Sequence, residues 1–277
     1  LRIAIAGDLH GSWSAEDHEI LDCLAPDVIL FVGDLGESDL KAASLIKKLS
    51  IPTAVILGNH DRGRDGSGEF LKAHIGLLGE LHCAWDLRRW KDIPLSVVGG
   101  RVCSAGGGFY LSKEVESLFG PMSIEQSVDE IVNACNSAPL ELPLIILAHS
   151  GPTGLGSNAH SICGRDWKSP SLDWGDKDLE LAIIELRKKR LPDLVVFGHM
   201  HHKLKSNNKY RDTFFQDKSG IKYLNAACVP RKFYDEHGHY LIHFSWVECE
   251  DQVIKSVSHR WFKKDGSLAY KEELYLS

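Results

Sequence analysis

The sequence has 277 residues, of which 43% are hydrophobic and 25% are charged. These values are ordinary for globular proteins and exclude a disordered, collagen-like or coiled-coil chain. The 38 acidic and 32 basic residues give a formal net charge of −6, which argues against a surface that binds nucleic acid or an anionic membrane. A bound metal ion can still supply the positive charge that a phosphate group needs.

The cysteines and the chain start bear on the cellular compartment. Seven cysteines are scattered without a C-x-x-C pair, which argues against a disulfide framework or a thiolate zinc site and indicates a reducing compartment. No apolar run approaches the roughly 18 residues of a membrane span, and no signal peptide is visible. The chain begins with Leu1 rather than Met, as a processed or truncated form of a longer protein would.

Short runs rich in Ile, Val and Leu predict buried strands, and amphipathic patterns between them predict helices. In chain order these are a strand at 2–6, a helix at 14–24, a strand at 28–32, a helix at 39–49, a strand at 53–57, a helix at 123–136, a strand at 144–148, a helix at 176–190 and a strand at 194–197. Strands that alternate with helices predict an α/β fold with crossover connections.

The remaining sequence has a different hydrophobic pattern. Three β-like runs, at 222–226, 240–247 and 253–261, predict a second and more antiparallel sheet. Residues 151–175 show no regular period, and about 25 structureless residues in a compact domain are more often functional than filler. Because this insert begins two residues after His149, we expect it to overhang the same region. The triplet Gly106-Gly107-Gly108 predicts a turn or a close backbone approach.

Each of the five strands in the first set is followed by polar side chains that can bind a metal ion. The candidates are Asp8, His10, Asp34, Asn59, His149, His199 and His201. Ligands in open α/β sheets bind at the carboxyl ends of the strands, so we expect these side chains to gather there. Neutral imidazole and carboxylate groups suit divalent Mn, Fe or Zn. A lone histidine after a strand is usually structural, whereas seven donors exceed one tetrahedral ion and fit two ions.

The order of these motifs closely resembles the signature of the calcineurin-like metallophosphoesterases. It reads D-x-H, G-D, G-N-H-D, a lone His and G-H-x-H between Asp8 and His201. The resemblance implies an α/β fold of four αββα layers, in which two mixed β-sheets are flanked by helices. With no linker or repeat visible, we expect one such domain over residues 1–277, with 151–175 as an insert near the active site.

The resemblance also implies a role for each motif residue. The first metal would be held by Asp8, His10, Asp34 and His201. Asp34 would bridge to a second metal, whose other ligands would be Asn59, His149 and His199. His60 would be a catalytic histidine that binds no metal, and Asp61 would orient it.

Two details narrow the resemblance within the family. Asp34 is followed by Leu35-Gly36-Glu37 rather than by the D-R-G-x continuation of the serine/threonine protein phosphatases, which argues against protein-phosphatase activity. The segments around Trp13 and Glu37, and the Gly-rich insert, look like a branch of cyanobacterial and plant-plastid members. That likeness implies the chloroplast stroma, and without it we expect the cytoplasm.

The predicted activity is hydrolysis of a phosphate ester of a small metabolite. Two divalent cations lower the pKa of a shared water from about 15.7 to about 7, and His60 can then protonate the leaving oxygen. Arg62 and Arg165 are candidates for binding a dianionic phosphate, which favours a phosphomonoester. Trp167 is a candidate wall for a planar group. The structural alternatives are an ordinary exposed loop arginine at 165 and a tryptophan that only packs the insert.

Two other functions are weighed against this one. A phosphodiesterase or a nucleotide pyrophosphatase would use the tryptophan-containing insert to hold a base. An inactive interaction module on the same fold would have lost metal ligands or the catalytic histidine, and none is missing between Asp8 and His201. We expect a small phosphorylated metabolite as the partner and no nucleic acid or membrane, and the sequence predicts no oligomeric state.

Overall fold

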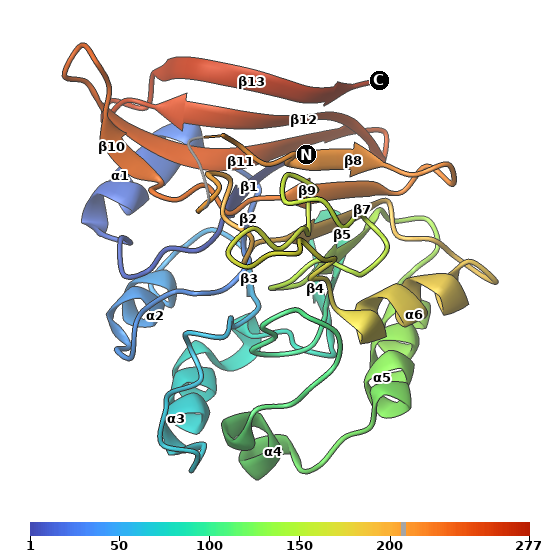
Figure 1. Ribbon diagram of the computed structural model, residues 1–277. Helices are drawn as coiled ribbons and strands as arrows, with labels where there is room; N and C mark the ends of the chain where they lie inside the picture. The colour runs from blue at the N-terminus through green and yellow to red at the C-terminus, as the bar shows by residue number, and fades with distance from the viewer. Residues whose placement is uncertain (206–208) are drawn as a thin grey trace.

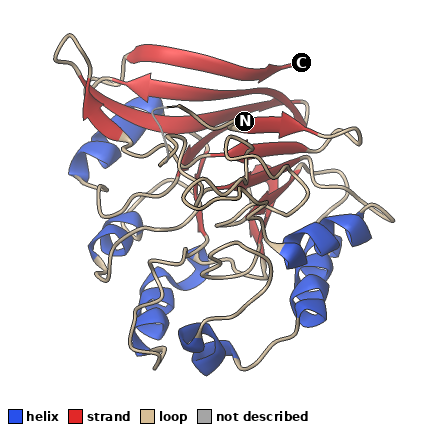
Figure 2. Cartoon of the chain, viewed as in Figure 1, coloured by secondary structure: helices blue, strands red, loops and turns tan. Residues whose placement is uncertain are grey.

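Two β-sheets lie between two groups of helices in the computed structural model, which describes residues 1–205 and 209–277 (Figures 1 and 2). Sheet A has the strand order β13-β12-β11-β1-β2-β3, with β10 paired to β11. Its strands are β1 (Arg2–Ala6), β2 (Val28–Phe31), β3 (Thr53–Val55), β10 (Lys232–Tyr234), β11 (Tyr240–Glu250), β12 (Val253–Phe262) and β13 (Leu268–Leu276). Strands β1 to β3 are parallel, and β11 runs antiparallel to β1.

Sheet B has the strand order β4-β5-β6-β7-β9-β8. Its strands are β4 (Leu87–Trp90), β5 (Ile93–Gly99), β6 (Leu144–Leu147), β7 (Leu194–Phe197), β8 (Phe214–Gln216) and β9 (Lys222–Asn225). The four central strands β5, β6, β7 and β9 are parallel, and the two edge strands are antiparallel to their neighbours. Both sheets are therefore mixed.

The helices divide between the two outer faces. They are α1 (Ala15–Leu24), α2 (Lys41–Ile46), α3 (Glu69–Leu78), α4 (Lys113–Phe119), α5 (Ile124–Asn136) and α6 (Lys177–Leu186), with a short 3₁₀ turn at Gly79–Leu81. Figure 1 shows α1, α2 and α3 on one side of the sheets and α5 and α6 on the other. No helix among the described residues is long and apolar enough to cross a membrane.

Alternation along the strands produces three apolar layers. In β1, Ile3 and Ile5 belong to a buried cluster shared with Ile145 and Val196 of sheet B, so this cluster fills the space between the sheets. Alternate β-strand side chains point to opposite faces, and Ala4 of β1 accordingly joins the cluster under α1 to α3. A third cluster lies between sheet B and helices α5 and α6. The chain is thus an αββα sandwich of four layers, as the sequence predicted.

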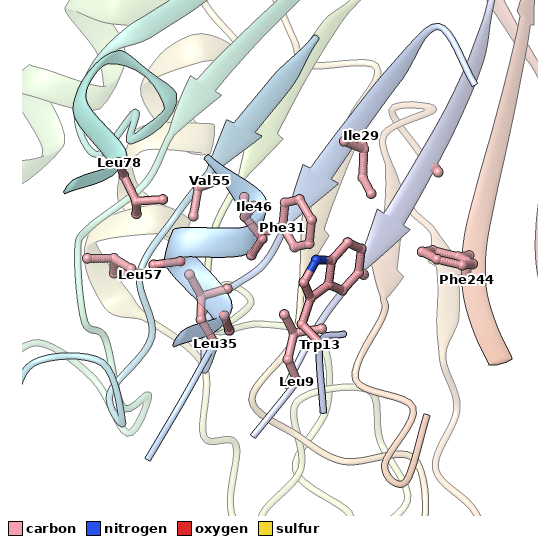
Figure 3. Close-up of a cluster of buried hydrophobic side chains, with 14 of the residues drawn as sticks. Leu9, Trp13, Ile29, Phe31, Leu35, Ile46, Val55, Leu57, Leu78 and Phe244 are labelled. Carbon is pink, nitrogen blue, oxygen red and sulfur yellow. The ribbon is translucent and has the colours of Figure 1, made fainter. Parts of the chain in front are cut away.

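The cluster beneath α1 to α3 is centred on aromatic rings (Figure 3). Trp13, in the loop before α1, lies 4.9 Å from the ring of Phe31 and 6.3 Å from that of Phe244, both nearly perpendicular to it. Edge-to-face pairs of this kind add about 0.5–1.5 kcal/mol beyond their buried area. They fix the segment after β1, which carries Asp8 and His10, against the sheet.

The predicted strands and helices are all present, with shifted ends. The helix predicted over 39–49 spans only Lys41–Ile46, because Lys48 and Leu49 donate to carbonyls three residues back, as in a tightened final turn. The run at 222–226 is β9, which pairs in parallel with β7 in sheet B, whereas β11 and β12 extend sheet A. The three late runs therefore do not form a sheet of their own, since strand pairing is decided by packing between distant segments.

Candidate metal centre

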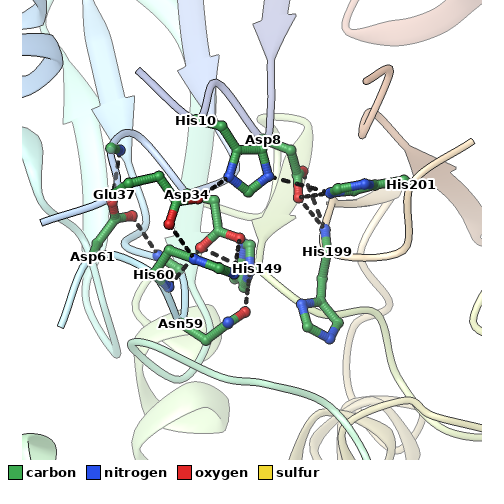
Figure 4. A network of polar contacts seen from close by, with 12 residues as sticks. Asp8, His10, Asp34, Glu37, Asn59, His60, Asp61, His149, His199 and His201 are labelled. Carbon is green, nitrogen blue, oxygen red and sulfur yellow. Dashed lines mark hydrogen bonds and ion pairs between the residues drawn. The ribbon is translucent and has the colours of Figure 1, made fainter. Parts of the chain in front are cut away.

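The candidate ligands come from the carboxyl ends of parallel strands in both sheets. Asp8 follows β1 and Asp34 follows β2, while His149 follows β6 and His199 follows β7. Because the two sheets pack face to face, these strand ends meet, and Figure 4 shows the side chains converging. The backbone ties them directly: the N–H of His199 donates to the Asp8 carboxylate at 3.1 Å.

Three groups of donor atoms result, each within 4.8 Å of one another. One joins His10, Glu37 and His60 and is described with His60 below, and the other two contain the candidate ligands. The first of these two joins Asp8, His10 and His201, with 3.6 Å between Asp8 Oδ1 and His201 Nε2. The second joins Asp34, His149 and His199, with 3.4 Å between Asp34 Oδ1 and His149 Nε2. Oxygen and imidazole donors in threes match the ligand chemistry of divalent transition metals.

The hydrogen bonds of His149 show that the second group fits a cation. Its Nδ1 lies 2.7 Å from the Val32 carbonyl, which only an N–H can satisfy. In the neutral ring Nε2 then carries a lone pair, and it faces Asn59 Oδ1 at 3.0 Å and Asp34 Oδ1 at 3.4 Å. Three acceptors directed at one another repel unless a proton or a metal ion lies between them.

Electrostatics lead to the same conclusion. Burial lowers the pKa of His149, but the adjacent Asp34 carboxylate outweighs it and raises that pKa to about 10. The pKa of Asp34 is held below its usual range by His149, although burial opposes this. Burial, together with the charge of His149, lowers the pKa of His199 to about 4, which leaves it as the neutral imidazole that metals bind. A positive charge between Asp34, His149 and His199 would therefore stabilise this group.

The other group shows the same feature. His10 Nε2 and His201 Nε2 are 3.2 Å apart, and His10 Nδ1 is bonded to the Glu37 carboxylate at 2.7 Å. Because Nδ1 donates to Glu37, His10 Nε2 is free to present a lone pair beside the Asp8 carboxylate. A carboxylate behind a histidine is the usual support of a metal-binding ring.

Four of the candidate ligands have a strained backbone conformation. Asp8, His10, Asp34 and His199 have φ values of 49°, 43°, 51° and 65°, the left-handed region that non-glycine residues rarely adopt. Such strain costs on the order of 1–3 kcal/mol per residue and clusters at functional sites. The site is also crowded, since a Cβ on Gly198 would lie 2.2 Å from Asp8 Oδ2. Glycine is required there for the carboxylate to approach the β7 turn.

His60 lies beside the donor groups, and its partner is Glu37. The Nδ1 of His60 is 2.9 Å from Glu37 Oε2, and its Nε2 is 4.0 Å from Asp34 Oδ2. Glu37 was not among the residues predicted to act, although it follows Asp34 by only three positions in the same turn. Because its two oxygens bond His10 and His60 separately, Glu37 sets the orientation of both rings.

Asp61 has a different position from the one the resemblance implies. Its buried carboxylate accepts N–H groups from Gly58 at 2.8 Å, Leu35 at 2.8 Å and Gly36 at 3.1 Å. Burial and the nearby Asp34 charge raise its pKa. Asp61 therefore joins the loops after β2 and β3, and the carboxylate bonded to the His60 ring is Glu37 instead.

A cavity of about 280 Å³ opens onto both donor groups. One wall contains His10, Asp34, His60, His199 and His201. A second wall comes from the insert and from the segment after β7, and contains Asp166, Trp167, Trp174, Lys203, Lys205 and Arg211. Neither lysine was predicted as a substrate contact, because the approach of both to the site depends on how loops fold over the sheets.

Two of the predicted substrate contacts lie outside this lining. Arg62 is directed to Glu114, with 3.5 Å between Nε and Oε2, and to the Tyr110 hydroxyl. Arg165 donates to the Pro170 carbonyl at 2.7 Å and stacks 5.1 Å from the Trp174 ring. Among the described residues, the cavity lining includes Trp167 but neither arginine.

Backbone pairing holds the insert against the glycine triplet. The N–H of Gly107 donates to the Trp174 carbonyl at 2.8 Å, and the indole N–H of Trp174 donates to Ala105 at 3.0 Å. A Cβ on Gly107 would lie 2.9 Å from the Trp174 ring. The predicted close backbone approach is therefore confirmed, and only glycine leaves room for this indole.

The four layers and the donor groups at the strand ends define an αββα protein with a candidate metal centre. A family model described as "Calcineurin-like phosphoesterase" matches residues 1–203. The chain belongs to this family, and it is a metallophosphoesterase that hydrolyses phosphoester bonds.

Solved structures share the fold at low sequence identity. A dimetal phosphatase from Danio rerio is 10% identical with a TM-score of 0.57, over 100% of this chain and 99% of that one. The protein TT1561 of Thermus thermophilus is 11% identical with a TM-score of 0.52, over 95% and 98%. GAP50 of Plasmodium, an anchor in the inner membrane complex, is 11% identical with a TM-score of 0.50, over 100% and 89%. No match is found among curated proteins.

Proposed function

We propose that this protein hydrolyses a phosphate monoester of a small, strongly anionic metabolite. The observation that carries the proposal is the cavity onto which both donor groups and His60 open. Its lining also holds two lysines, Lys203 and Lys205, which favour an anionic substrate. A monoester carries up to about two negative charges near neutral pH, whereas a diester carries one, so two bound metal ions would suit the monoester better.

The donor groups support a site for two divalent metal ions. Asp8, His10 and His201 would hold the first, and Asn59, His149 and His199 the second, with Asp34 between them. Imidazole and carboxylate donors favour Mn, Fe or Zn. When bound, the two ions would supply Lewis acidity, which polarises the phosphoryl group and lowers the pKa of water.

The side chains around the ions complete the reaction. As the imidazolium, His60 would donate Nδ1–H to Glu37 and could give its Nε2 proton to the leaving oxygen, and a proton released by the attacking water would restore it. The phosphorus–oxygen bond to the alcohol breaks, a bond from water oxygen to phosphorus forms, and the products are the alcohol and inorganic phosphate. Glu37 keeps the His60 ring in this orientation during the proton transfer.

Metal-dependent hydrolysis tests the proposal. The purified chain is stripped of metal, re-supplied singly with Mn, Mg, Zn or Fe, and assayed with p-nitrophenyl phosphate and bis-p-nitrophenyl phosphate. We expect turnover that requires metal and favours the monoester. A preference for bis-p-nitrophenyl phosphate would favour the phosphodiesterase or nucleotide pyrophosphatase instead, and metal binding without any turnover would favour an interaction module. The chloroplast location stays a prediction from the sequence.

A further inference from the structure

The part of the cavity lining that holds no metal donors contains features that the hydrolysis of a simple ester does not use. Trp167 is 44% exposed at the cavity, and Lys205 Nζ lies 5.6 Å from the centre of its ring. Lys203 lines the same cavity. The exposed indole and the two ammonium groups form a second recognition surface beside the metal donors.

This surface is held rigidly from behind. Trp174 packs perpendicular to Trp167 with 5.3 Å between ring centres, and its own indole N–H is bonded to Ala105. Arg165 lies beneath the Trp174 ring, 5.1 Å from its centre. Trp174 therefore holds the Trp167 ring in place. Less conformational entropy of the side chain is then lost when a planar group stacks on the exposed part of Trp167.

The backbones that carry the two lysines are anchored as well. Lys203 forms an antiparallel bridge with Tyr210, and the N–H of Lys205 donates to the Asp166 carboxylate. Asp166 also faces the guanidinium of Arg211 at 3.3 Å, so its charge is already matched. Within residues 1–205 and 209–277, no carboxylate forms an ion pair with the ammonium of Lys203 or Lys205.

We infer that Trp167, Lys203 and Lys205 select phosphate esters whose alcohol part carries an aromatic ring and a second anionic group. This inference rests on the proposed phosphomonoesterase activity. The metal ions and His60 would take the reacting phosphoryl group, so the two lysines, which line the same cavity but belong to neither donor group, would meet the rest of the substrate. Ammonium groups suit a phosphate or carboxylate, and the indole suits a planar ring. A nucleoside bisphosphate has this chemistry.

Four substrates separate the two parts of the inference. Adenosine 3′,5′-bisphosphate carries both the ring and the second anion, adenosine 5′-monophosphate only the ring, and fructose 1,6-bisphosphate only the second anion. p-Nitrophenyl phosphate, which has no second anion and only a small ring, reports on the metal centre. We expect kcat/KM to be highest for adenosine 3′,5′-bisphosphate.

The variants are Lys203→Gln with Lys205→Gln, and Trp167→Ala. The lysine pair should lower kcat/KM about tenfold more for the two bisphosphates than for p-nitrophenyl phosphate, since two contacts at an open rim are lost. Trp167→Ala should act mainly on the adenosine substrates. Lys218→Gln is the matched control, because this exposed lysine lies outside the metal cavity, and it should leave all four values unchanged.

Binding measured without turnover keeps the inference separate from the proposed function. Calorimetry on the metal-loaded His60→Ala variant, which should hold its metals, compares adenosine 3′,5′-bisphosphate with the monophosphate. Tighter binding of the bisphosphate that the lysine substitutions abolish supports the inference even if no substrate is hydrolysed. Equal binding of the two nucleotides, or an equal loss of kcat/KM for all four substrates in the lysine variant, would overturn it.

Discussion

The two walls of the cavity are built in different ways. The metal-donor wall consists of short loops that directly follow buried strands, and these loops are joined by backbone bonds such as His10 N–H to Asp34 O at 2.9 Å and Gly198 N–H to His149 O at 2.9 Å. The insert wall consists of a segment between β6 and α6 that has no helix or strand. One wall derives its geometry from the sheets, and the other needs its own supports.

Those supports are buried charges. Arg101 is 3% exposed and pairs with Asp176 at 2.7 Å and Asp178 at 3.0 Å, at the point where the insert enters α6. Arg211 donates to three carbonyls of the insert, those of Ala159, Ser161 and Gly164. The comparison shows that strained backbone is tolerated where sheets lie beneath it, whereas a long irregular segment is positioned by ion pairs.

The largest effect on hydrolysis is expected from substitution of Asp34, which lies between the two donor groups. Asp34→Asn removes the charge shared between the donor groups, so we expect hydrolysis to fall about a thousandfold or more. Metal content, measured by mass spectrometry of the purified protein, should fall with it. Asp22→Asn, on the exposed face of α1, is the control. Full metal content together with near-normal turnover would remove Asp34 from the centre.

A substitution that removes a support of the insert wall should lower the stability of the fold rather than the rate of the chemical step. Arg101→Met leaves Asp176 and Asp178 buried without their cation, which should lower the free energy of unfolding by about 3–5 kcal/mol. Arg187→Gln, whose exposed pair with Asp217 lies at 2.8 Å, should cost less than about 1 kcal/mol. Urea unfolding of both variants gives the comparison. Equal costs would mean that the buried pair is not the support of the insert.

Substitution of His60 tests whether metal binding and proton transfer depend on different residues of the metal-donor wall. His60→Ala should lower kcat about a hundredfold or more, because a general acid is lost. Both metal ions should remain, since the Asp8 group and the Asp34 group are each complete without His60, which groups with His10 and Glu37. Metal analysis beside kinetics decides the matter, and an empty site would assign His60 to the ligands.

The smallest of these effects is expected at Glu37. Glu37→Gln keeps the size of the side chain but removes the charge behind His10 and His60, so we expect turnover to fall about tenfold. Asp39→Asn, an exposed carboxylate in the same loop, should have no effect. If Asp61→Asn lowered kcat with fold and metals intact while Glu37→Gln did not, Asp61 would be the orienting residue after all.

The donors of the metal wall were predictable because they depend on local sequence. A run of Ile, Val and Leu that ends in Asp8 or His149 predicts a buried strand and a polar side chain at its carboxyl end. The αββα arrangement was implied by the family resemblance that these motifs carry. Each of these signals spans a few residues, which is the distance over which periodicity and turn chemistry act.

The substrate side of the site was not predictable in this way. Glu37 bonds His60 across 23 positions, and Lys205 faces Trp167 across more than 35. Arg62 and Arg165 had the right chemistry, but tertiary packing directs them to Glu114 and Pro170. The sequence by itself determined the strands and their terminal donors. Only the tertiary structure decided which strands share a sheet and which side chains complete the cavity, because these choices depend on contacts between distant segments.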